Sequence, residues 1–414
     1  MAKPRLLFLA HRTPYPPDKG EKIRAWHTLE HLARDWTVDL GCLLDDPADF
    51  RHLPMLQACC AEVHAAPVTR GGRIARTLFG TRPGQPLSLA WFHEPGLARW
   101  VKAGLAAQRY DAVMVYSSAM AAYIPSRHDG VPRILDMVDV DSEKWRAYAQ
   151  STEGPKRLVW AREARTLLAF ERRAAARFDR TLLVSAQEAE TFAALAPEVA
   201  PRIDWVENGV DIARFDPDCV WPDPFEARSP AIVFTGTMDY RPNVEAVSFF
   251  AKEVMPRLSS LAPLPHFHIV GANPSPAVRA LAQLPRVHVT GSVPDIRPYL
   301  AHAAVAVAPL RIARGIQNKV LEAMAMARPV VASPEAYEGV RAIAGQDLLV
   351  ANGAEAMATA VALVLAGRRP CMGAAARAAV LAGHDWKATL ARLDEILASA
   401  SPNHGRPSRA AFQT

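Results

Sequence analysis

Lys319 and Glu322 stand three residues apart in a segment that is otherwise mostly apolar, and their types suit the binding of an anion and of hydroxyl groups. The segment 315–333 predicts a glycine-containing loop, a buried helix over Lys319–Ala327, a tight connection and a strand. A lysine in the first turn of a helix lies at the positive end of the helix dipole, which favours a bound phosphate there. An acid one turn later on the same face can accept hydrogen bonds from sugar hydroxyls. The pattern indicates a nucleotide site, and the alternative is a surface ion pair worth about 0.2–0.5 kcal/mol.

Two glycine-containing loops precede helices and are further candidates for phosphate binding. In the proline-rich loop 10–24, Gly20 opens a helix, and Lys19, Lys22 and Arg24 add positive charge. This loop is not a G-x-G-x-x-G sequence, so it does not predict a nicotinamide site. The alternative is a tight turn with solvated lysines.

The second of these loops follows a predicted buried strand in the C-terminal half. Gly236 permits close approach of a ligand to the backbone, and Arg241 suits bidentate binding of phosphate. Together with Lys319, Arg241 would hold a departing diphosphate. The alternative is an exposed loop arginine.

Acidic residues lie at the end of another predicted strand, at Asp136, Asp139 and Asp141. Carboxylates at a strand end can bind a metal, act as a base or hold acceptor hydroxyls. For each acid the alternative is a helix cap, to which Asp141 or Ser142 is suited.

Two stretches, 70–82 and 151–180, combine arginines with apolar side chains. Such stretches can lie on an anionic membrane surface. The alternative is that they are the solvated faces of ordinary helices.

The elements that must position these residues alternate between strand and helix, which predicts an α/β fold with parallel sheets. We expect strands at Arg5–Ala10, Thr37–Leu44, Glu62–Ala66, Ala112–Tyr116, Arg133–Met137, Thr181–Val184, Ile203–Val206, Ala231–Thr235, His266–Val270, Val287–Thr290, Val305–Ala308 and Pro329–Ala332. We expect helices at Lys22–Arg34, Gly96–Gln108, Asn243–Leu258, Ala277–Gln283, Asp295–Ala301, Lys319–Ala327, Gly373–Ala382 and Trp386–Ala398. Prolines mark a linker between the two halves.

Composition limits the function classes. The chain has 414 residues, 22% of them charged, a net charge of +6 and five scattered cysteines. These cysteines suit a reducing cytoplasm and form no zinc motif. No apolar run is long enough to span a membrane, and no motif indicates nucleic-acid binding. The mild positive charge fits an anionic substrate or an anionic membrane surface.

Four elements in order resemble the retaining GT-B glycosyltransferases of family 4. They are the segment Val206–Phe215 with its Asn-Gly-Val-Asp sequence, the Gly236 loop, Gly291-Ser292-Val293, and the segment Lys319–Ala325. The loop Pro14–Gly20 and the segment Asp136–Trp145 look more narrowly like the sugar transferases associated with the exosortase A/PEP-CTERM exopolysaccharide system.

The resemblance implies two Rossmann-like domains facing across a cleft. The N-terminal acceptor domain would be 1–207, the linker 208–229, the donor domain 230–383, the helix that crosses back to the first domain 384–400, and a disordered tail 401–414. It implies a retaining, metal-independent hexosyltransferase with no cofactor. The donor would be a nucleotide sugar, and the acceptor a saccharide or a lipid-linked saccharide. The enzyme would be cytoplasmic, with peripheral contact to the inner face of the cell membrane.

The resemblance also implies roles for single residues. Arg241 and Lys319 would hold the diphosphate, and Glu322, the second acid of an E-x7-E motif, would bind the ribose. Backbone near Val293 would face the base, and Gly20 would approach the diphosphate. Gly315 would be part of the donor-binding loop.

The chain departs from the family pattern at Arg314, which stands where the first acid of E-x7-E is expected. The usual histidine of the N-terminal domain could be His11, or Asp136 or Asp139 could serve in its place. Two other functions stay open, a sugar-nucleotide epimerase of similar shape and a non-catalytic nucleotide-sugar-binding protein.

Overall fold

The computed structural model describes residues 3–17, 20–126, 130–225, 229–313 and 315–400. The described residues form two compact units, one up to Val206 together with Leu390–Ala400, and one over Glu207–Thr389. The tail 401–414, for which disorder is expected, lies outside the described residues. Within the described parts of the chain, no helix is both long and apolar enough to cross a membrane.

The first unit is built on a seven-stranded sheet in the order β3-β2-β1-β4-β5-β6-β7. Every neighbouring pair in it is parallel. The strands are β1 Arg5–Ala10, β2 Thr37–Leu44, β3 Glu62–Pro67, β4 Ala112–Tyr116, β5 Arg133–Val138, β6 Arg180–Leu183 and β7 Ile203–Trp205. The central strands are buried along most of their length, as expected for a parallel sheet covered on both faces.

The second unit has a six-stranded parallel sheet in the order β10-β9-β8-β11-β12-β13. Its strands are β8 Ala231–Thr235, β9 His266–Val270, β10 Val287–Gly291, β11 Val305–Ala308, β12 Val330–Ala332 and β13 Leu349–Val350. β13 is only two residues long, so its sequence carries no periodicity by which we could have predicted it.

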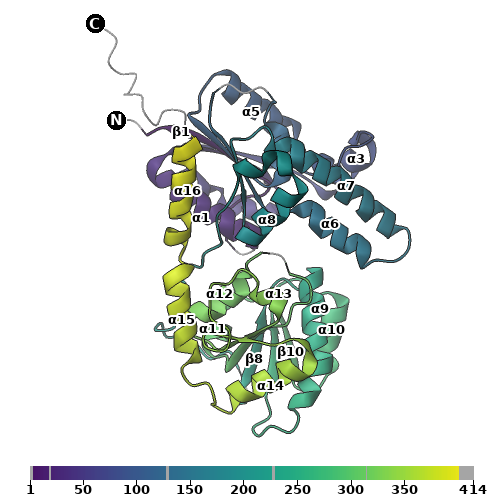
Figure 1. The fold of residues 1–414 in the computed structure, drawn as a ribbon, viewed down its shortest axis with the longest axis vertical. Coiled ribbons are helices and arrows are strands. Elements are labelled where there is room, and N and C mark those ends of the chain that lie inside the picture. Colours follow the sequence, from purple (N-terminus) through teal and green to yellow (C-terminus); the bar gives the residue numbers. More distant parts are fainter. Residues whose placement is uncertain (1–2, 18–19, 127–129, 226–228, 314, 401–414) are drawn as a thin grey trace. The chain divides into compact units, whose positions relative to one another are not determined.

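Helices connect the strands and flank both sheets (Figure 1). In the first unit the α-helices are α1 Gly20–Asp35, α2 Leu53–Cys59, α3 Arg70–Gly80, α4 Leu87–Trp91, α5 Pro95–Ala106, α6 Asp141–Gln150, α7 Lys156–Ala175 and α8 Ala186–Leu195. In the second they are α9 Arg241–Phe249, α10 Pro276–Ala280, α11 Arg297–Ala301, α12 Asn318–Ala325, α13 Pro334–Tyr337, α14 Gly353–Leu365 and α15 Met372–Gly383. The last helix, α16 Trp386–Ala400, starts in the second unit, and its residues from Leu390 belong to the first.

The α/β class expected from the sequence is confirmed, and two expected helices are divided. The expected helix Ala277–Gln283 is α10 followed by a 3₁₀ turn over Leu281–Gln283. Asn243–Leu258 was expected as a single helix, whereas α9 ends at Phe249 and continues as a π-helical turn and a 3₁₀ turn. Pro256 lies in the 3₁₀ turn. Because proline lacks an N–H and its ring clashes with the carbonyl one turn earlier, a regular α-helix does not continue there.

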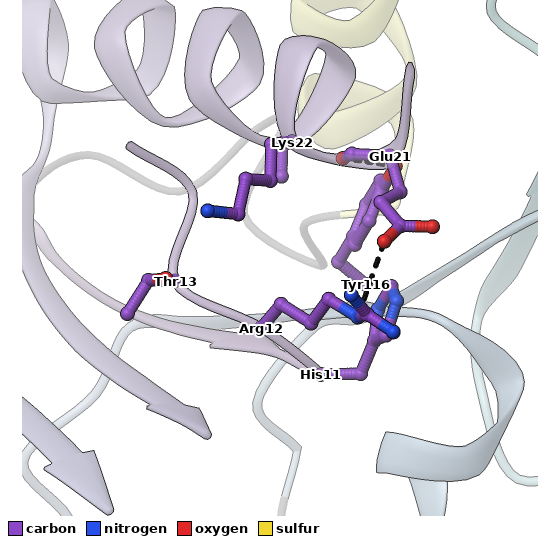
Figure 2. A pocket seen from close by; sticks show the side chains of 7 residues that line it. His11, Arg12, Thr13, Glu21, Lys22 and Tyr116 are labelled. Carbon is purple, nitrogen blue, oxygen red and sulfur yellow. Dashed lines mark hydrogen bonds and ion pairs between the residues drawn. The ribbon is translucent and has the colours of Figure 1, made fainter. Parts of the chain in front are cut away.

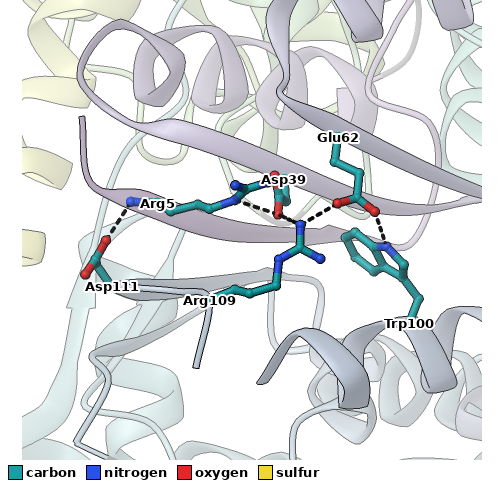
Figure 3. Close-up of polar contacts among 6 residues, drawn as sticks. All are labelled: Arg5, Asp39, Glu62, Trp100, Arg109 and Asp111. Carbon is teal, nitrogen blue, oxygen red and sulfur yellow. Dashed lines mark hydrogen bonds and ion pairs between the residues drawn. The ribbon is translucent and has the colours of Figure 1, made fainter. Parts of the chain in front are cut away.

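A network of ion pairs ties β1, β2 and β3 together (Figure 3). Arg5 donates two hydrogen bonds to the fully buried carboxylate of Asp39, at 3.0 and 2.8 Å. Arg109 bridges Asp39 and Glu62, and the indole N–H of Trp100 donates to Glu62 at 2.6 Å. Hydrogen bonds to charged groups are stronger than neutral ones, so this network stabilises the register of the three strands.

Replacing Asp39 by Asn should lower the free energy of unfolding by about 3 kcal/mol, because two arginines lose the buried charge that they share. Chemical denaturation of the full chain measures the change. Asp35→Asn is the matched control, since Asp35 is exposed at the end of α1. Equal stability of both variants would contradict a stabilising role for the network.

Candidate functional site

Each sheet has one point at which the strand order reverses direction, between β1 and β4 in the first unit and between β8 and β11 in the second. The loops that follow the two strands at such a point diverge to opposite faces of the sheet. Open α/β sheets bind ligands in the crevice that results. The two candidate sites of the chain lie at these points.

In the second unit, Gly236 directly follows β8 at this point and has a φ of +156°. A Cβ atom on Gly236 would lie 2.7 Å from Nδ2 of Asn243 and 3.5 Å from Cε of Lys319. Gly271, with a φ of +151°, meets the same loop so closely that a Cβ would lie 1.7 Å from the Gly236 carbonyl oxygen. The missing side chain of Gly236 therefore lets Asn243 and Lys319 approach the loop, and that of Gly271 lets the backbone of Gly236 pass close by.

Lys319 lies in the first turn of α12 and is half-buried. Its Nζ donates a hydrogen bond to Oδ1 of Asn243 at 3.1 Å and lies 5.3 Å from the ring centre of Phe234. Burial lowers the pKa of Lys319 to about 8, an effect that the charge of Glu322 partly offsets. The positive charge of the ammonium group is therefore only partly balanced by neighbouring negative charge, and the group is suited to bind an anion.

Glu322 follows one turn later on α12, and only 9% of it is exposed. Burial raises the pKa of its carboxyl group to about 7, against the opposing effects of Lys319 and Arg214. Perturbed ionisable groups at a strand-order reversal are typical of functional sites. The pair is therefore partly buried, and the surface ion pair considered above does not describe it.

The other residues expected to bind the donor in the second unit have fewer contacts in common with Lys319. Arg241 begins α9, two residues before Asn243, and forms an ion pair with Glu245 at 2.7 Å. Gly315 is buried, has a φ of +61° and accepts a hydrogen bond from Gln317. Val293 packs against the hydrophobic core after β10. Within the part of the chain that the structure describes, no hydrogen bond joins Val293 or Gly315 to Lys319, and their roles stay predictions.

In the first unit, a small pocket lies at the point where β1 and β4 diverge (Figure 2). It is lined by His11, Arg12, Thr13, Glu21, Lys22, Ala25 and Tyr116. His11 follows β1, and its ring stacks on Tyr116 with centres 5.8 Å apart and meets the edge of Phe92 at 5.4 Å. Burial lowers its pKa, and its Nδ1 is buried without a hydrogen-bond partner. A neutral imidazole with a free nitrogen can accept or donate a proton.

The pocket's charged residues are positioned by α1. Arg12 forms an ion pair with Glu21 at 3.1 Å, drawn in Figure 2. The Tyr116 hydroxyl donates to the Glu21 carbonyl oxygen at 2.8 Å. Gly20, the expected phosphate contact, is the exposed first residue of α1.

The cations expected near Gly20 have other partners inside the fold. Lys22 donates to the buried Asp49 at 2.7 Å. Arg24 donates to both carboxylate oxygens of Asp136 and to the carbonyl oxygen of Val206. The positive charge that Lys22 and Arg24 were expected to add for a phosphate is therefore paired inside the fold, and the alternative of a solvated lysine at Lys22 is wrong.

The two expected catalytic acids differ in environment. Asp136 is buried in its ion pair with Arg24. Asp139 follows β5, and burial raises the pKa of its carboxyl group to about 7, with Glu188 and Asp141 acting in the same direction. A carboxyl group that titrates near neutral pH suits proton transfer, so Asp139 is better placed for that role than Asp136.

Sequence reasoning did not identify Asn243 or Tyr116 as site residues. Both types are common in structural positions, and only the convergence of α9 with α12, and of β4 with β1, brings them to the sites. Arg314, which stands at the position of the expected acid, and Lys19 lie outside the described residues.

Two family models match the chain. The model of the glycosyl transferase 4-like domain matches residues 19–209, and the model of glycosyl transferases group 1 matches residues 229–367. No curated protein matches the chain at a significant level.

Solved structures with the same fold cover nearly the whole chain. A sucrose-phosphate synthase from Thermosynechococcus elongatus has 18% identity and a TM-score of 0.70, over 96% of this chain and 99% of its own. HepE from Anabaena, solved with UDP and glucose, has 15% identity and a TM-score of 0.66, over 96% and 100%. WaaG, a glycosyltransferase involved in lipopolysaccharide biosynthesis, has 17% identity and a TM-score of 0.65, over 94% and 99%. Both matched models describe glycosyltransferase domains, and with the two Rossmann-like domains they identify the chain as a GT-B glycosyltransferase of the family 4 type.

Proposed function

We propose that this glycosyltransferase moves a hexosyl group from a nucleoside diphosphate donor to an acceptor hydroxyl, with retention of configuration. The main support for binding of the donor is the group of side chains that Lys319, Glu322 and Asn243 form beside the Gly236 loop. The neighbour HepE, solved with UDP and glucose, supports a uridine nucleotide as the first donor to test.

The donor would lie with its diphosphate at the first turn of α12. There Lys319, Arg241 and the helix N-terminus stabilise the negative charge that grows on the leaving phosphate. Glu322, one turn further along the helix, accepts hydrogen bonds from the ribose hydroxyls. To bind the diphosphate, Arg241 would give up its ion pair with Glu245. Both side chains of this pair are partly exposed, so the ion pair is weak.

The sugar–phosphate bond breaks to give an oxocarbenium-like sugar and a nucleoside diphosphate. The acceptor oxygen then attacks from the side that the phosphate has left, and the departing phosphate oxygen takes the acceptor proton. This route gives retention, requires no metal ion and leaves to the protein the stabilisation of charge and the exclusion of water. His11 and Asp139 in the first unit would orient the acceptor hydroxyl.

For the biological role, we propose assembly of an exopolysaccharide on a saccharide or lipid-linked acceptor at the cytoplasmic face of the membrane. The resemblance of the loop Pro14–Gly20 and the segment Asp136–Trp145 to transferases of exosortase A/PEP-CTERM systems supports this role. Acceptor-dependent release of the nucleoside diphosphate separates a transferase from an epimerase, which releases none, and from a binding protein, which has no turnover.

Substitutions on α12 test the donor site. Lys319→Ala should weaken binding of both UDP and inorganic diphosphate by at least about tenfold, since a charged hydrogen-bond donor is lost. Glu322→Gln should weaken UDP binding alone, because diphosphate has no ribose. Isothermal titration calorimetry on the full chain measures both. Lys252→Ala is the matched control, an exposed lysine of the same unit. If Lys319→Ala bound UDP as the unmodified chain does, the donor would lie elsewhere.

The affinity for UDP should depend on pH through Lys319. Below its pKa of about 8 the ammonium group is charged before the nucleotide binds. Above this pH the free protein must first take up a proton, so the affinity should fall by up to about tenfold per pH unit. Calorimetry between about pH 6.5 and about pH 9.5 measures this fall in the affinity for UDP. The range brackets the pKa of Lys319 by about 1.5 units on each side. In Lys319→Gln the affinity should be low and flat above pH 8, and an unchanged slope there would assign the effect to another group.

His11→Asn tests the role of the first unit. The variant should keep its affinity for UDP but lose transfer activity by about 100-fold, the loss expected when a reacting hydroxyl is no longer held in position. The rate of acceptor-dependent UDP release measures the loss. His31→Asn is the control, because His31 bonds Asp394 on α16 away from the pocket. Full activity of His11→Asn would remove this histidine from the mechanism.

A further inference from the structure

The backbone that leads to Asp139 has a conformation that its residues do not favour. β5 has a register shift between Asp136 and Val138, and Val138 has a φ of +69°. A β-branched residue rarely adopts a positive φ, because its Cβ atom then comes close to a backbone carbonyl oxygen. Such a residue persists only where the surrounding contacts fix it. Because Val138 directly precedes Asp139, the contacts that fix this turn also determine where Asp139 lies.

Local hydrogen bonds hold the first half of the turn. The Val138 N–H donates to Oδ1 of Asp136 at 3.1 Å. The Asp139 N–H donates to the carbonyl oxygen of Met137 at 3.0 Å. Asp136 is itself fixed by its buried ion pair with Arg24. These contacts set the backbone up to Asp139, and the residues after it are held by other partners.

Two buried carboxylates from distant helices hold the second half of the turn. Glu188 on α8 accepts a hydrogen bond from the Val140 N–H at 3.0 Å. Glu171 on α7 accepts one from the Ser142 N–H at 3.2 Å and one from the Ser142 hydroxyl at 2.5 Å. Val140 precedes α6 and has no side chain that can bond the start of the helix. The two acids therefore satisfy buried N–H groups at this helix N-terminus.

The turn lies beside the pocket of the first unit. Asp136 on β5 is the register partner of Tyr116 on β4, and Tyr116 lines the pocket. Burial and, to a smaller extent, the charges of Asp136 and Asp139 raise the pKa of Tyr116. Burial lowers the pKa of His11, and the charge of Asp141 opposes that effect. The carboxyl groups of the turn therefore act on the side chains that line the pocket.

Glu188 also acts on Asp139 through its charge. After burial, the charge of Glu188 contributes most to raising the pKa of Asp139, and Asp141 on α6 adds to it. Lys144 on α6 and Arg24 on α1 act in the opposite direction and offset these effects only in part. A carboxylate beside a second negative charge is more basic, so it accepts a hydrogen bond from a hydroxyl group more strongly.

We propose that Glu188 is a positioning residue for the transfer reaction. It holds the turn that carries Asp139 through the Val140 N–H, and its negative charge strengthens the hydrogen bond that Asp139 accepts from the attacking hydroxyl group. The proposal rests on the proposed function, in which Asp139 orients this hydroxyl group, and adds the residue on which that role depends. Asp139 acts in its ionised form, and the proton of the hydroxyl group still passes to the departing phosphate oxygen.

Glu188→Gln separates the two effects of Glu188, because glutamine keeps an oxygen that can accept from the Val140 N–H and removes the charge. Heteronuclear NMR of the full chain, isotope-labelled at its aspartate carboxyl groups, measures the pH at which Asp139 is half ionised, and Asp139→Asn assigns the signal. This midpoint should fall by about one pH unit in Glu188→Gln, as expected for the loss of one neighbouring like charge. Glu190→Gln, at an exposed position of α8, should leave it unchanged.

Glu171→Gln tests whether any buried acid that holds the turn has the same effect. Burial raises the pKa of Glu171 to about 8, so at neutral pH its carboxyl group is mostly protonated and glutamine resembles it. The midpoint of Asp139 should therefore stay in place in this variant. An equal fall in Glu171→Gln and Glu188→Gln would assign the effect to loosening of the turn and overturn the electrostatic role of Glu188.

The rate of UDP release from UDP-glucose, with water as the acceptor, measures the effect on the reaction. Glu188→Gln should lower this rate by about threefold, since Asp139 becomes less basic. Glu188→Ala should lower it by about 100-fold, because the turn is no longer held. Both variants should bind UDP as the unmodified chain does.

An unmoved midpoint of Asp139 in Glu188→Gln, or equal rates in Glu188→Ala and the unmodified chain, would overturn the role of Glu188 alone. Full activity of Asp139→Asn would instead contradict the proposed function at Asp139, and the role of Glu188 with it. The Asp139 variant therefore distinguishes a failure of this proposal from a failure of the proposed function.

Discussion

The parallel direction of the strands is the constraint on which both candidate sites depend. When all strands of a sheet run the same way, the loops that follow them leave at the same edge. The order of strands then decides which loops meet there. His11 follows β1 and Tyr116 ends β4, and the two rings stack because these strands are neighbours. Gly236 follows β8 in the same way, at the reversal between β8 and β11.

The charged residues at the two ends of the strands of the first sheet differ in how well they are paired. Near the starts of β2 and β3, Asp39 and Glu62 share arginines and an indole N–H, and these carboxylates have strong partners. At the opposite edge, Asp139 has a pKa raised by burial and by neighbouring acids. A network of satisfied ion pairs stabilises a fold, whereas an unsatisfied buried charge responds to whatever binds beside it. The contrast assigns stability to the first edge, and the proposed chemistry belongs to the other.

The same reasoning applies to the candidate donor site and to Arg73 on α3. Lys319 and Glu322 are partly buried, and each shifts the pKa of the other against the effect of burial. Arg73 is more deeply buried and leaves two of its nitrogen atoms without a hydrogen-bond partner. Both arrangements cost stability in the free protein.

The sequence by itself determined the α/β class and most of the strands, because their runs of apolar residues are required by burial in a parallel sheet and are local in the sequence. It also singled out Lys319 and Glu322, whose spacing puts them on one face of a helix. Only the tertiary structure decided that Lys22 and Arg24 are paired inside the fold with Asp49 and Asp136, and that Asn243 supports Lys319. These contacts join residues from 27 to 112 positions apart. No local pattern encodes such a partner, since it is chosen by how strands and helices pack.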